Sequence, residues 1–199
     1  MDTVRRRHTI IAPLSVLCFV LFGAALALAD WNSNTRIESM LVFAPNPALR
    51  QVSVSIERHD TESIELLKDM ADFLEDSLTP KGGLALPQLG VSKRGFVVLV
   101  DDDPVIMINP KVTVSGDQVA SLEGCLSIPD TFGYVHRFEN VLVEYHDENW
   151  QHQSLSLDDI ESFAVQHEHD HLNGILISDN FLPNKYNDPE KNARMLDIE

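Results

Sequence analysis

The sequence predicts an α+β fold in which mostly antiparallel strands pack around one central helix. Residues 140–146 alternate between apolar and polar side chains. Residues 151–157 follow after a short turn, so the two segments are expected to form a hairpin. A helix begins near Leu157, with acidic residues in its first turn, and ends at the Asn-Gly pair of residues 173–174. A hairpin followed directly by one long helix is typical of this fold class.

The first half of the chain predicts a second helix and three more strands. A helix is expected over residues 61–78, because apolar side chains recur there every three or four positions and Pro80 follows. These apolar side chains are Ile64, Leu67, Met70, Ala71, Leu74 and Leu78. Strands are expected over residues 94–100, 105–108 and 111–114, and an acidic turn joins the first two.

The helix that follows the hairpin carries the strongest chemical signal, the H-E-x-x-H pattern of residues 167–171. Residues four apart share one face of a helix, so His167 and His171 can bind a single metal ion. Glu168 then lies beside the metal, where it can take a proton from a bound water. One stripe of the helix carries apolar side chains in its first half and the two possible metal ligands in its second half. It is expected to face inward and consists of Ile160, Phe163, Ala164, His167 and His171. The alternative is a surface helix that happens to carry two histidines.

Two further blocks bear on this site. Cys125 lies in the Glu-Gly-Cys-Leu-Ser block of residues 123–127, and its thiolate would complete a site of two histidines and one cysteine with a fourth position open for water. Otherwise Cys125 is a buried thiol that behaves as a small hydrophobe. Residues 82–88 form a glycine pair leading to Gln88, which alone indicates a turn entering an edge strand.

The three blocks, in this order, resemble the motifs of the peptide deformylase family, G-x-G-x-A-A-P-Q, E-G-C-L-S and Q-H-E-x-D-H. The second and third motifs match fully. The first departs at Lys81 and Leu86, and Leu86 is expected to narrow or shift the substrate cleft. The resemblance runs from about Met40 to about Leu182.

This resemblance implies a hydrolase that removes the formyl group from N-formylmethionyl peptides and releases formate. It implies one divalent metal, Fe²⁺, with Zn²⁺, Ni²⁺ or Co²⁺ able to occupy the same ligands. The implied roles are metal ligation by Cys125, His167 and His171, catalysis by Glu168, Gln88 and the backbone N–H of Leu126, and substrate binding by Gly83, Leu84 and Gly124.

Three neighbouring residues are given supporting roles. Glu123 and Arg137 are expected to pair near the site, as similar positions do in the family, with a plain surface ion pair as the alternative. Asp170 is given a structural role. His169 lies on the opposite face of the helix from the ligands and is expected to contact solvent or a strand.

Composition and the chain's two ends limit the partners and the location. A net charge of −16 over 199 residues argues against nucleic acid and anionic lipid. Arginines at residues 5–7, an apolar run over residues 9–29 and a small-x-small site at its end are typical of a signal peptide or membrane anchor. The domains expected are therefore a signal peptide or anchor at residues 1–29, a linker at 30–39 and a catalytic domain at 40–199.

This organisation predicts a membrane-anchored or exported protein, or a cytoplasmic one if translation begins at Met40. The C-terminal residues 183–199 are short and of mixed charge, so they do not predict ribosome docking. Two alternative functions remain from the sequence. One is an exported metal-dependent amidase or peptidase acting on another acyl-peptide. The other is a catalytically weak relic of the fold that binds metal or peptide.

Overall fold

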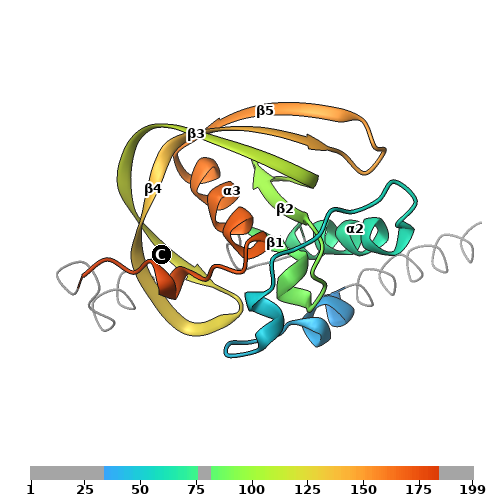
Figure 1. The fold of residues 1–199 in the computed structure, drawn as a ribbon, viewed down its shortest axis with the longest axis horizontal. Coiled ribbons are helices and arrows are strands. Elements are labelled where there is room, and N and C mark those ends of the chain that lie inside the picture. Colours follow the sequence, from blue (N-terminus) through green and yellow to red (C-terminus); the bar gives the residue numbers. More distant parts are fainter. Residues whose placement is uncertain (1–33, 76–81, 184–199) are drawn as a thin grey trace, which may run out of the picture. The chain divides into compact units, whose positions relative to one another are not determined.

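The computed structural model describes residues 34–75 and 82–183, which form one antiparallel sheet and its covering helices (Figure 1). The sheet order is β1-β2-β3-β4-β5, so each strand pairs with its sequence neighbour. The strands are β1 (Gly83–Ala85), β2 (Gly95–Val100), β3 (Asp103–Cys125), β4 (Ile128–His146) and β5 (His152–Asp158). Helix α3 (Asp159–Leu172) packs against all five strands. The predicted α+β class with antiparallel strands is confirmed.

Strand β3 is much longer than predicted: it joins the two strands expected at residues 105–108 and 111–114 and then continues to Cys125. The sequence between them, Asn109-Pro110, suggests a break. Instead the register of β3 against β4 shifts here. The Asn109 side chain accepts from the backbone N–H of Ile56 at 2.8 Å and donates to the Ile56 carbonyl at 2.9 Å. The strand therefore continues past the irregularity and ends at Cys125, and a two-residue turn leads into β4.

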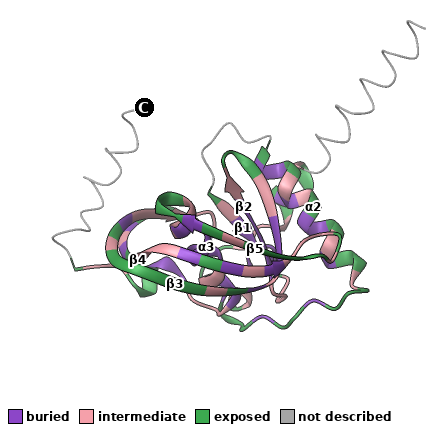
Figure 2. Cartoon of the chain, turned by 90° about the horizontal axis from the view of Figure 1, so that it is seen from above, coloured by how far each residue is buried: buried purple, intermediate pink, exposed green. Residues whose placement is uncertain are grey.

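Two clusters of buried apolar side chains form the core. Helix α2 (Thr61–Glu75) begins where predicted, and its buried residues help to form the first cluster against β1, β2 and β3; residues 76–81 lie outside the described part. The second cluster lies between α3 and the five strands, with Ala85 as its residue from β1. Much of β3, including residues 113–118, faces solvent (Figure 2).

Leu86 belongs to the first core cluster, so the prediction that it narrows the substrate cleft is wrong. Its side chain is fully buried, and a side chain on Gly95 would lie 3.1 Å from its Cδ1 atom. Leucine at this position therefore fills the core. Replacing it with alanine would leave a cavity rather than widen a binding site.

The linker predicted at residues 30–39 is partly helical. Residues 34–40 form a helix, and Ile37 lies fully buried in the first core cluster, while Arg36 makes an ion pair with Asp69 of α2. One apolar residue in a polar segment was too weak a signal to predict this docking. Among the described residues, none of the helices combines the length and apolar character of a membrane span.

We expect Ile37→Ala to lower the free energy of unfolding by about 2–5 kcal/mol, because the change leaves a cavity in the core. Urea denaturation monitored by circular dichroism would measure the difference. Ile160→Ala is the matched control. Ile160 also lies in a helix but is 79% exposed, so its replacement should change stability by about 0.5 kcal/mol or less. Equal losses in both variants would show that the 34–40 helix is not part of the folded core.

Candidate active site

The structure brings Cys125, His167 and His171 together from two elements. Cys125 lies at the end of β3, and the two histidines lie one turn apart on α3. One potential ligand atom from each residue lies within 4.8 Å of the other two. The Cys125 Sγ and His171 Nε2 atoms are 3.4 Å apart. Two ligands of a tetrahedral metal lie about 3.6 Å apart for bonds of about 2.3 Å to sulfur and 2.0–2.1 Å to nitrogen, so the donor set fits a small divalent metal.

A chain of buried polar contacts orients His167. Its Nδ1 atom lies 2.9 Å from a carboxylate oxygen of Glu123, which leaves Nε2 free to face the cluster. Arg137 donates two hydrogen bonds of 2.9 Å to Glu123 and one of 2.7 Å to Asp170. The side chains of Glu123 and Arg137 are only 9% and 7% exposed, so a plain surface ion pair is excluded. The sequence did not predict the link to Asp170, which depends on how β4 packs against α3.

These contacts set the charges of Glu123 and His167. Burial opposes ionisation of Glu123, but hydrogen bonds from His167 and Arg137 lower its pKa to about 2. Burial likewise opposes protonation of His167, but hydrogen bonds to Cys125 and Glu123 raise its pKa to about 10 in the metal-free chain. Burial lowers the pKa of His171, so that imidazole is neutral and available as a ligand.

Glu168 is buried beside the two histidines, with 3% of its surface exposed. Within the described residues, its Oε2 atom has no hydrogen-bond partner. Burial raises the pKa of Glu168 to about 7; the nearby charges of His167 and Arg137 lower this pKa and those of Glu123 and Asp170 raise it, each by less. A buried carboxyl group whose pKa lies near neutrality can accept a proton at neutral pH and return it.

Gln88 is buried rather than a polar residue at a strand edge. It lies in the short 3₁₀-helix Leu86–Leu89, with 2% of its surface exposed. Its carbonyl oxygen accepts from the backbone N–H of Ala85 at 2.8 Å, and its amide nitrogen lies 3.7 Å from Cys125 Sγ. The amide group therefore points its donors toward the cluster. Leu126 follows Cys125 in the turn between β3 and β4.

The residues predicted to bind substrate flank the cluster. Gly83 and Leu84 lie in β1, which is an edge strand among those described, and the Leu84 side chain is fully buried in the core. Only the backbone of Leu84 is therefore available to a substrate. Gly124 precedes Cys125, and a side chain there would lie 2.5 Å from the ring of Phe132. That ring is 36% exposed and covers the backbone next to the thiol.

The inward stripe predicted for α3 is correct for the histidines and wrong for its first turn, because Ile160 is 79% exposed. Val165 and Leu172 supply buried apolar contacts of α3 to the second core cluster, and the partly buried Ala164 of the predicted stripe packs against the same cluster. The helix thus has two buried faces, one polar and one apolar, which a single periodic stripe does not capture. For His169 the sequence predicts a contact with solvent or a strand; its Nε2 atom lies 3.2 Å from the guanidinium of Arg94, the residue that precedes β2.

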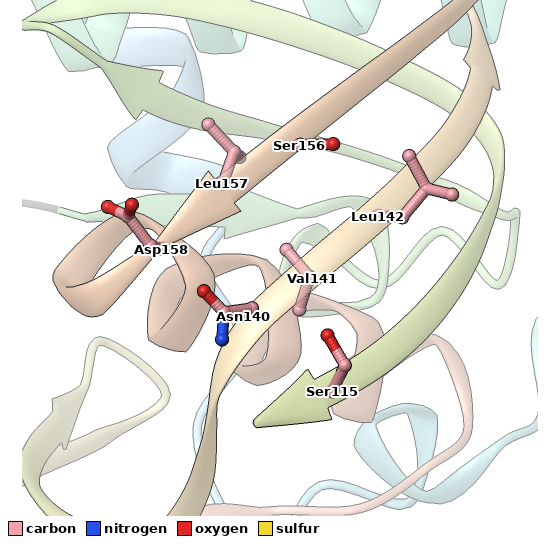
Figure 3. Close-up of a pocket in the computed structure, with 7 residues that line it drawn as sticks. All are labelled: Ser115, Asn140, Val141, Leu142, Ser156, Leu157 and Asp158. Carbon is pink, nitrogen blue, oxygen red and sulfur yellow. The ribbon is translucent and has the colours of Figure 1, made fainter. Parts of the chain in front are cut away.

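A separate hollow of about 180 Å³ lies on β3, β4 and β5 (Figure 3). It is lined by Ser115, Asn140, Val141, Leu142, Ser156, Leu157 and Asp158. None of these is a predicted site residue, and they offer one carboxylate with no other titratable side chain. The hollow therefore contributes nothing to the chemistry of the cysteine–histidine cluster.

Comparison with known proteins agrees with this geometry. Residues 39–187 match the model of a family described as polypeptide deformylase. A peptide deformylase from Agrobacterium fabrum is 38% identical over 145 residues, which cover 70% of this chain and 84% of the relative. One from Rhizobium meliloti is 39% identical over 145 residues, which cover 70% of this chain and 82% of the relative.

Solved structures give the same result. The crystal structure of peptide deformylase from Thermotoga maritima matches with a TM-score of 0.65 and 31% identity, over 72% of this chain and 97% of that chain. A peptide deformylase from Synechococcus elongatus in complex with actinonin matches with a TM-score of 0.67 and 33% identity, over 80% of this chain and 86% of that chain.

These comparisons contradict the predicted membrane anchoring or export of this chain. The Thermotoga relative is covered almost completely by its match to this chain, so it consists of the catalytic fold alone. The prediction rested on the composition of residues 1–29, which lie outside the described part. A charged start and an apolar run are signals of composition alone, and the family match over residues 39–187 lies beyond them.

Proposed function

The chain belongs to the polypeptide deformylase family, and from this premise we propose how its residues remove the formyl group from N-formylmethionyl peptides. The close approach of Cys125, His167 and His171 carries the proposal. These three side chains hold one divalent metal, and α3 is the metal-binding helix. The catalytic domain is residues 40–199, extended by the helix at 34–40 because Ile37 is part of the core.

Ferrous iron is the proposed metal, on the basis of the family resemblance. The donor set of two imidazoles and one thiolate also suits zinc, and the usual affinity order favours zinc over ferrous iron. Elemental analysis of protein purified without oxygen and without added metal would identify the ion. When bound, the metal lowers the pKa of a coordinated water toward about 7 and polarises the substrate carbonyl.

The chain's own residues move the protons and stabilise the charge. Glu168 takes the proton from the attacking water and later gives it to the leaving amine, since its carboxyl group is buried and has one oxygen free of other partners in the described part. As the formyl carbon becomes tetrahedral, its oxygen gains negative charge. The Gln88 amide and the Leu126 backbone N–H are the proposed hydrogen-bond donors to that oxygen.

Release of formate from a formyl-Met tripeptide tests this function. We expect rapid release from the formylated peptide and little hydrolysis of the acetylated or unblocked peptide. Preferential cleavage of the acetylated peptide would identify an amidase of different specificity. No cleavage of any peptide by the metal-loaded protein would identify a binding relic of the fold.

Glu123→Gln should weaken metal binding about 10- to 100-fold, the usual effect of losing the partner that orients a metal-bound histidine. Glutamine keeps the size of the side chain but removes the charge that both His167 and Arg137 face. Competition with a chelator would measure the affinity. The control is Glu144→Gln, which also removes an acid from a strand but loses only an ion pair with Lys111 on an exposed face. Equal affinity in the Glu123 and Glu144 variants would contradict the orienting role.

A further inference from the structure

We propose that Gly83 is a positioning residue for Glu168, and that the missing side chain at this point of β1 leaves the space in which the proposed base lies. A methyl group on Gly83 would lie 2.8 Å from Glu168 Cγ and 2.8 Å from Glu168 Oε1. It would also lie 2.8 Å from the carbonyl oxygen of Val97. Non-bonded carbon and oxygen atoms do not approach this closely without displacement, so both the Glu168 side chain and the Val97 carbonyl would have to move away from the new methyl group.

Strand β1 cannot readily move away from a methyl group on Gly83. Gly83 pairs with Val98 of β2, and the next two residues of β1, Leu84 and Ala85, are fully buried. Moving β1 away from α3 would therefore break ladder contacts and expose core side chains. Among the described residues, the Glu168 Oε2 atom has no hydrogen-bond partner, so this side chain is displaced more easily than the strand and is the group expected to shift furthest.

The neighbouring glycine, Gly82, meets the same helix without a close contact. A methyl group on Gly82 would lie 3.4 Å from the Cβ atom of Ala164, which is an ordinary van der Waals contact. Ala164 and Glu168 are one turn apart on α3. Two successive residues of the chain thus meet the same helix, but only Gly83 lies against the carboxyl group.

This inference rests on the proposed role of Glu168 as the base. A shift of about 1 Å in a catalytic group can cost about 10²-fold in rate. We therefore expect Gly83→Ala to lower kcat about 100-fold while metal content stays near one per chain. KM should change little, because a displaced base affects the reaction more than substrate binding. Gly82→Ala should keep kcat within about threefold of the unaltered protein.

A double-mutant cycle tests the mechanism. The kcat and KM of the full-length, metal-loaded chain would be measured on a formyl-Met tripeptide for Gly83→Ala, Glu168→Gln and the double variant. If Gly83 acts through the base, adding Gly83→Ala to Glu168→Gln should lower kcat by no more than about threefold. If the loss of kcat in the double variant equals the product of the two single losses, or if Gly83→Ala changes KM alone, the proposal is wrong and Gly83 is assigned to substrate binding. Normal kcat in Glu168→Gln would instead refute the proposed role of Glu168 as the base, on which this inference rests.

Stability provides a second cycle, which also applies if Gly83→Ala folds poorly. Glu168→Ala removes the atoms that the new methyl group would meet. Gly83→Ala should then cost less free energy of unfolding in the Glu168→Ala background than in the unaltered chain. An equal cost in both backgrounds would place the conflict at the Val97 carbonyl and would contradict the proposal.

Discussion

Alanine in place of Cys125, His167 or His171 should reduce metal content well below one ion per chain and remove measurable deformylation. Each change deletes one of three donors, and two donors alone hold a divalent metal far more weakly. The two histidines are almost fully buried, so the loss cannot be compensated by a nearby exposed side chain without rearranging the core. Elemental analysis after exhaustive dialysis would measure the occupancy of each variant.

His169→Ala is the matched control for this experiment. His169 lies on α3 between the two proposed ligands, but it contacts Arg94 and Asn173 instead of the cluster. Its replacement should leave metal occupancy near one per chain. Full occupancy in all three ligand variants, or a loss in His169→Ala as large as in His171→Ala, would refute the assigned donor set.

The parts of the fold that were predictable have strong local signals. Alternation over residues 140–146 identified the β4–β5 hairpin, and the boundaries of α3 followed from its acidic first turn and the cap at Gly174, which has the positive φ of 73° that glycine adopts without strain. The three donors were identified because their chemistry is rare at this spacing. Bringing Cys125 to the histidines required only that one hairpin end beside one helix.

What could not be predicted depends on tertiary packing. Burial of Ile37 and continuation of β3 past Asn109 each depend on contacts with residues distant in the sequence, and the exposure of Ile160 depends on which elements pack against α3. The same is true of Arg137, whose guanidinium joins Glu123 to Asp170 across two elements. A local pattern indicates which face of an element is apolar. It does not indicate whether another element arrives to cover that face.

Glu168→Gln should lower kcat about 10²- to 10⁴-fold while the metal and the fold remain. Glutamine has the same shape as glutamate, so the contacts with Gly83 and the packing of α3 are kept. What it loses is the ability to take a proton from water and give one to the leaving amine. Steady-state kinetics on a formyl-Met tripeptide, with metal content and thermal unfolding measured on the same samples, would separate these effects. A variant with near-normal kcat would show that another group is the base.

The pH dependence distinguishes loss of the base from loss of structure. The base must be ionised, so the kcat/KM of the unaltered enzyme should fall as pH drops through the pKa of Glu168, which burial raises to about 7 in the metal-free chain. A bound cation favours the carboxylate, so this decline should lie below pH 7 in the loaded enzyme.

The stability of the metal-free chain should depend on pH in the opposite direction to kcat/KM. Between the ordinary value of 4.5 and about 7, the folded chain holds a proton that the unfolded chain has released, so stability should fall as pH rises. Glu168→Gln should remove this component of both profiles, and their persistence in the variant would assign the titration to a different group.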